Sequence, residues 1–121
     1  EPEASPGAYL SLQKGAPCER IPLKPSVADG LAGGLSPLPF EIAHHLIDRV
    51  ALAAEEDIVA AMTAFFTEEQ LVVEGAASVG LAVLLAGKIK LPVKKVVLVI
   101  TGRNVAAERF LSIIAPVGEC E

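Results

Sequence analysis

Hydrophobic side chains recur at helical spacing along much of the chain. Phe40, Ala43 and Leu46 lie three residues apart and predict one face of a helix that opens at Pro39. Ile58 begins a similar series, and a nearly all-apolar stretch bounded by glycines follows it. The predicted helices cover residues 5–13, 39–50, 55–69, 75–87 and 106–114.

Two of these helices carry start signals in the sequence. Ser5 can cap the first predicted helix with its hydroxyl, and Pro6 fits the first helical turn. Glu55 and Glu56 lie where acids favour a helix N-terminus.

Other hydrophobic runs lack this period and predict strands. Residues 96–100 are contiguous Val, Leu and Ile, as in a parallel strand covered on both faces. They predict a strand over residues 94–101, and residues 50–53 predict a shorter one. Strands that alternate with helices indicate an α/β layer with parallel strands. Because a sheet of so few strands is marginal alone, we expect further strands from outside the chain.

Residues 16–39 predict a long irregular loop. They hold five of the nine prolines, and glycines are frequent among them. Loops of this length are uncommon in compact domains and are usually functional. The run Ala28-Asp29-Gly30 is expected to bring bare backbone close to a ligand, so we place this loop on the side of an active site.

Composition narrows the class of protein. The chain has 121 residues, of which 52% are hydrophobic and 4% aromatic, and its mean hydropathy is +0.52. That hydropathy is high for a small domain, so part of the apolar surface is expected to lie against another chain or segment. We therefore interpret residues 1–121 as a single, partial domain.

Charge and hydrophobic run lengths exclude several partners. The net charge of −5, without a basic run, argues against nucleic-acid binding. No run reaches the roughly 18–20 apolar residues that span a bilayer. No signal peptide is visible, the chain does not begin with Met, and its two cysteines form no CxxC pair. These features favour a fragment or processed chain in the cytoplasm.

Candidate chemistry gathers between residues 71 and 104. Glu74 is one acid set against an apolar run, and it is either a ligand-facing acid or a simple helix cap. Thr101 ends the predicted strand, where open α/β sheets bind ligands, or it caps the last helix. Gly102 permits a tight turn, and the following Arg103 and Asn104 either bind an anionic group or face solvent.

Five segments together resemble a known family. They read EPEASPGAYLSLQKG, SVADGLAG, PFEIAHHLIDRV, LVVEGAASVGLAVLLAGK and KKVVLVITGRNV, in that order. In order and spacing the chain resembles the C-terminal part of the serine/threonine dehydratases, which are pyridoxal-phosphate enzymes with the tryptophan-synthase-β type of fold. The resemblance implies the C-terminal part of the large, cofactor-binding domain, with parallel strands flanked by helices.

The resemblance also implies roles for the candidate residues. Thr101 matches the hydroxyl that meets the pyridine nitrogen of pyridoxal phosphate, and Glu74 matches an acid beside the cofactor ring. Gly30 matches backbone near the cofactor, whereas Asp29 and Arg103 are placed on the substrate side. The turn completed by Gly102 and Asn104 is expected to contact the cofactor.

The chain departs from the family pattern at several positions. Glu1 and Ser5 match two of three positions that hold a divalent cation in some members, but the third is Gly7 instead of Asp, so a metal site is doubtful. Arg103 replaces the usual Gly of the hydroxyl-Gly-Gly-Asn turn and resembles the branch linked to hydroxyectoine breakdown. Gly75 stands where Pro is common.

The implied function is that of a fragment. The family's Schiff-base lysine, substrate-carboxylate loop and phosphate-binding glycines lie upstream of Glu1, so no catalytic residue is expected in this chain and it should be inactive alone. The parent would convert a β-hydroxy amino acid of the threonine or serine class to a 2-oxo acid and ammonia. Its expected partners are the upstream half, the amino-acid substrate and further copies in a homo-oligomer. The alternatives are a non-catalytic assembly or binding module, and a racemase or other lyase of the same fold.

Overall fold

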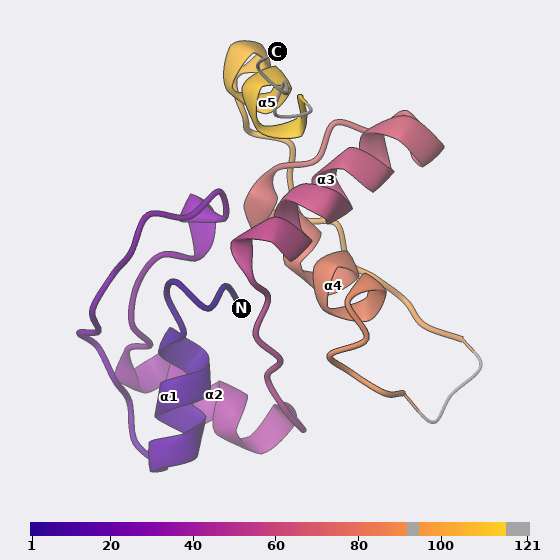
Figure 1. Ribbon diagram of the computed structural model, residues 1–121. Helices are drawn as coiled ribbons and strands as arrows, with labels where there is room; N and C mark the ends of the chain where they lie inside the picture. The colour runs from indigo at the N-terminus through magenta and orange to yellow at the C-terminus, as the bar shows by residue number, and fades with distance from the viewer. Residues whose placement is uncertain (92–94, 116–121) are drawn as a thin grey trace.

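The computed structural model describes residues 1–91 and 95–115 (Figure 1). Within them the chain is helical, with irregular segments between the helices. The elements are α1 (Gly7–Lys14), the 3₁₀ turn η1 (Asp29–Leu31), α2 (Pro37–Leu46), α3 (Glu55–Glu69), α4 (Gly75–Leu85) and α5 (Ala107–Ile114). The predicted helices are thus confirmed, with ends that move by a few residues.

Helices α3 and α4 form the centre of the molecule. Figure 1 shows α3 crossing over α4, with α5 at the top of the view, on the side of α3 away from α4. Ile58 and Met62 of α3 are fully buried, as is Ala82 of α4. Phe110 of α5 joins the same core and meets Phe66 edge to face, with ring centroids 5.5 Å apart. The apolar period of the sequence therefore marks a real helical interface.

The predicted strands are extended segments without a ladder. In the described residues the β pairing found is one isolated parallel bridge, between Pro2 and Ala53. Residues 95–101 run beside α4 toward α5, and Val97 and Val99 are 88% and 78% exposed. A strand needs a hydrogen-bonding neighbour, and the described residues supply none here. Residue 94, where the second strand was predicted to begin, lies outside the described residues.

The N-terminal portion differs from the predicted pattern at two helix starts. Ser5 was expected to cap the first helix, but its hydroxyl bonds to the loop between η1 and α2. The Ser5 hydroxyl accepts a hydrogen bond from Gly33 N–H (2.9 Å) and donates one to Leu31 O (3.4 Å). The second helix begins at Pro37 instead of Pro39, since proline fits the first turn of a helix. Figure 1 shows α1 and α2 side by side, below the long loop that joins them.

One lysine ties the N-terminus to the helical core. The Nζ of Lys88 lies 2.8 Å from Asp57 Oδ2 and 3.0 Å from Glu3 Oε1. The hydrogen bond from Lys88 lowers the pKa of the Asp57 carboxyl, and the bonds to Asp57 and Glu3 raise the pKa of the Lys88 ammonium.

No helix among residues 1–91 and 95–115 is both long enough and apolar enough to cross a membrane.

Candidate functional site

Glu74 and the 101–104 turn are in direct contact. The Glu74 carboxylate accepts a hydrogen bond from Asn104 N–H (Oε2 to N, 3.1 Å), and Glu74 N–H donates to Gly102 O (3.3 Å). The start of α4 and the end of the extended segment 95–101 are thereby held together. Two candidates separated by 30 residues in sequence thus belong to one cluster.

The loop before η1 packs tightly on the first turn of α4. A Cβ at Gly75 would overlap the carbonyl of Val27 and lie 3.0 Å from Ala28 N. The same loop is held from α3, where Glu55 Oε2 accepts a hydrogen bond from Val27 N–H (2.8 Å). Gly30 follows and reaches Ala76, with 3.1 Å between its ideal Cβ position and the alanine Cβ. The predicted glycine backbone therefore lies at the same helix start as Glu74.

Asp29 makes an ion pair that the sequence did not indicate. Arg109 of α5 donates from Nη1 to Asp29 Oδ2 at 2.7 Å, and both side chains are half exposed or more. The two residues are 80 positions apart, so no local spacing could have shown the contact. Asp29 was placed on the substrate side, and this role stays a prediction.

Thr101 and Arg103 line a hollow beside the turn. The hollow has a volume of about 220 Å³ and mostly apolar walls. Both side chains are exposed, and the Thr101 hydroxyl bonds to no other residue in the described part of the chain. Helix α5 begins at Ala107 with Ala106 as its N-cap, so Thr101 does not cap it. The hydroxyl and the guanidinium are thus both available to a ligand.

Glu1 and Ser5 lie apart from this cluster, at the start of α1. The Glu1 carboxylate accepts hydrogen bonds from Ala8 N–H and Tyr9 N–H, both at 2.8 Å, so it serves as the anion at this helix N-terminus. Ser5 is fully buried. Nowhere in the described ranges do three or more His, Cys, Asp or Glu side chains gather as a metal site. The carboxylate that a cation would use is engaged in capping.

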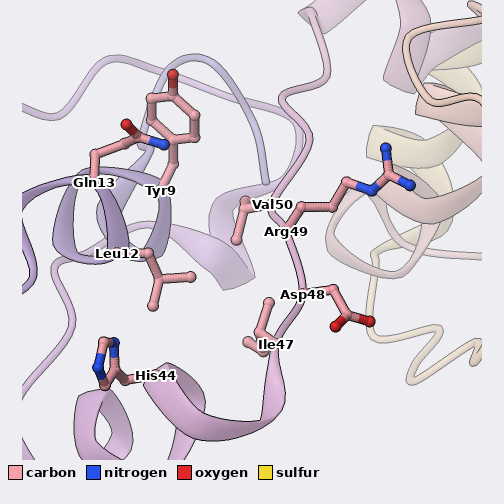
Figure 2. A pocket seen from close by; sticks show the side chains of 8 residues that line it. All are labelled: Tyr9, Leu12, Gln13, His44, Ile47, Asp48, Arg49 and Val50. Carbon is pink, nitrogen blue, oxygen red and sulfur yellow. The ribbon is translucent and has the colours of Figure 1, made fainter.

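A separate cleft lies between α1 on one side and the end of α2 with the segment that follows it on the other (Figure 2). It has a volume of about 290 Å³. In Figure 2 the side chains of Asp48 and Arg49 point away from those of Tyr9 and Gln13, and His44 stands at the other end. Since its polar groups do not converge, the cleft has no built ligand site. The lining residues are Tyr9, Leu12, Gln13, His44, Ile47, Asp48, Arg49 and Val50.

Comparison with known proteins identifies the family. A family model described as "Pyridoxal-phosphate dependent enzyme" matches residues 1–102. The L-threonine ammonia-lyase of Geobacter sulfurreducens is 38% identical over 108 residues, which are 87% of this chain and 26% of that protein. The chain belongs to the pyridoxal-phosphate dependent enzyme family, and the predicted resemblance to the dehydratases is confirmed.

Solved structures support the fold assignment. The crystal structure of serine racemase from Dictyostelium discoideum matches 88% of this chain and 34% of its own, with a TM-score of 0.77 and 31% identity. The crystal structure of a threonine deaminase from T.th. matches 76% of this chain and 33% of its own, with a TM-score of 0.70 and 30% identity. The chain therefore spans only about a quarter to a third of these relatives.

Proposed function

We propose that the chain is the C-terminal part of a pyridoxal-phosphate-dependent dehydratase. The parent would convert a β-hydroxy amino acid of the threonine or serine class to a 2-oxo acid and ammonia. The observation that carries the proposal is the meeting of Glu74, the 101–104 turn and the loop around Gly30 at the start of α4. These are the segments for which the dehydratase resemblance implies cofactor contacts, and a relative named L-threonine ammonia-lyase aligns over 87% of the chain.

The residues present fit the part of the cofactor site assigned to them. Thr101 offers an exposed, uncharged hydroxyl at the carboxyl end of an extended segment, which suits a contact to a ring nitrogen. Gly30 and Gly102 offer backbone without a side chain. Bound pyridoxal phosphate would supply the electron sink that lets a Cα proton leave. A neutral Thr101 partner does not hold a proton on the ring nitrogen as a carboxylate would, and this favours β-elimination over transamination.

Arg103 and Asp29 are proposed to face the substrate. Arg103 has an exposed guanidinium beside the hollow and is suited to pairing with a carboxylate. Asp29 lies on the loop next to Gly30, where Arg109 holds its carboxylate. Arg103 is therefore the residue at which we expect substrate choice to depart from that of threonine dehydratases.

The exposed segment 95–101 supports the proposal that more of the enzyme packs here. Val97 and Val99 project into solvent on a stretch suited to a buried strand. We infer that upstream strands of the same enzyme pair with this segment to form a parallel sheet. A non-catalytic binding module would also use this apolar surface, and activity assays of the parent separate the two.

The experiment compares the full-length protein with this chain. The full-length protein, incubated with pyridoxal phosphate and L-threonine or L-serine, should release 2-oxo acid and ammonia, while the chain alone should release neither. A Thr101→Ser variant should keep the activity and a Thr101→Ala variant should lose most of it. Measurable release of 2-oxo acid by this chain alone would refute the proposal.

Racemisation is the second candidate, because the matching structures include serine racemase. The same reactions should be followed for loss of optical activity of the amino acid. D-amino acid in place of 2-oxo acid would identify the protein as a racemase of this fold. A panel of further hydroxyamino acids then tests whether Arg103 changes the substrate.

A further inference from the structure

The side chain of Glu74 leaves its own helix. Glu74 is the N-cap residue of α4, but its carboxylate makes no capping hydrogen bond. The hydrogen bonds at this helix start go to the main-chain carbonyl of Glu74 instead. That oxygen accepts from Ala77 N–H (3.1 Å) and from the Ser78 hydroxyl (3.0 Å). The carboxylate is therefore free to be used elsewhere.

The Glu74 carboxylate and the Glu74 backbone N–H each make one hydrogen bond to the 101–104 turn. Glu74 Oε2 accepts from Asn104 N–H, and Glu74 N–H donates to Gly102 O. The two contacts fall on either side of Arg103. A turn tied at both of these residues cannot rotate about its own axis without breaking one of the bonds.

Gly102 is shaped to receive the acid. A Cβ at this position would overlap Glu74 Oε1 and lie 3.0 Å from Cδ of the same side chain. The carboxylate thus lies against the bare Cα of Gly102, the residue next to Thr101. The Glu74 side chain therefore packs against the backbone that directly follows Thr101.

We propose that Glu74 is a positioning residue that sets the place of the Thr101 hydroxyl, and that it does so as a hydrogen-bond acceptor. The inference rests on the proposed function, in which Thr101 contacts the cofactor. The Asn104 backbone N–H requires only a lone pair, and the side-chain carbonyl of glutamine supplies one as well as a carboxylate does. Proton exchange with a substrate would instead require the acid itself.

These two roles predict different effects of Glu74→Gln and Glu74→Ala in the full-length protein. Glu74→Gln should keep the absorbance spectrum of the bound cofactor and lie within about threefold of the parent in activity. Glu74→Ala should shift the spectrum and weaken cofactor binding by about tenfold, the equivalent of one lost hydrogen bond. Glu108→Ala, on the exposed first turn of α5, is the matched control and should change neither.

Hydrogen exchange tests the contact without relying on activity. Exchange of the peptide that contains Asn104, followed by mass spectrometry, should be alike in the parent and Glu74→Gln and about tenfold faster in Glu74→Ala. Equal exchange in the parent and Glu74→Ala would overturn the inference. So would a Glu74→Gln protein as impaired as Glu74→Ala, because that result requires the acid itself. Failure of the parent to bind pyridoxal phosphate would instead refute the proposed function, and the exchange result would then decide the inference alone.

Discussion

Replacing Gly75 by alanine tests how closely α4 packs on the loop before η1. The added Cβ would overlap the Val27 carbonyl, and the neighbouring Ala28 N would be only 3.0 Å away. Both contacts are with backbone, so relief requires a shift of the loop or of the helix start. Gly75 itself is buried, and solvent offers no escape for the methyl group.

The size of the effect follows from two opposing terms. Overpacking costs about 1–3 kcal/mol, and a clash with backbone belongs at the upper end of that range. Alanine regains at most about 1 kcal/mol over glycine inside a helix, and less in the first turn. We therefore expect the free energy of unfolding to fall by about 2 kcal/mol in Gly75→Ala, and the melting temperature by several degrees.

Gly80→Ala in the same helix is the control. Its Cβ would lie 3.2 Å from Leu98 Cδ2, the flexible end of a side chain that can move aside. This variant should be neutral or stabilised by up to about 1 kcal/mol. Both variants should be measured by calorimetry in the full-length protein. Equal melting temperatures for Gly75→Ala and Gly80→Ala would refute the packing of α4 on the loop.

Three further predictions concern the core and the ion pairs. Met62→Ala empties a fully buried site and should lower the free energy of unfolding by about 3 kcal/mol, measured by denaturant titration. The hydrogen bond from Lys88 lowers the pKa of Asp57, so the ionised carboxylate stabilises the fold at pH values above the ordinary Asp pKa, and this stabilisation is lost as the pH falls through the lower, folded-state pKa. Melting curves of Asp57→Asn, measured against pH, should lack this loss of stability in acid. A pH profile identical to that of the parent would count against the ion pair. Arg109→Ala should cost less than about 1 kcal/mol, because its pair with Asp29 is exposed, and a larger loss of melting temperature would show that the pair is more than a surface contact.

Local patterns predicted the helices well. The acids at Glu55 and Glu56 and the apolar period after them placed α3 at its observed bounds. Gly15 ends α1 in the left-handed conformation (φ 69°), as a glycine after a helix is expected to do. The prediction failed at Ser5, whose hydroxyl was assigned to the first helix but is taken by Gly33, 28 residues away. No local signal distinguishes these two partners.

The strands and the candidate site depend on contacts between segments far apart in the sequence, which the local pattern of residues does not reveal. The composition of residues 96–100 indicates a strand, but a strand exists only when a neighbour pairs with it. Glu74 and the 101–104 turn were each singled out, yet their contact spans 30 residues. Arg109 was missed because nothing in its own segment marks it as the partner of Asp29.

The exposed segment 95–101 has a consequence for handling the chain on its own. Residues 96–100 form an uncharged run of Val, Leu and Ile, the composition from which cross-β fibrils assemble. Because no strand among residues 1–91 and 95–115 pairs with it, the segment is a template on which further copies can add. Lys95 and Arg103 flank the run and oppose such stacking by charge repulsion. We therefore expect the isolated chain to form fibrils that bind thioflavin at high salt, and a Val97→Lys substitution to suppress them.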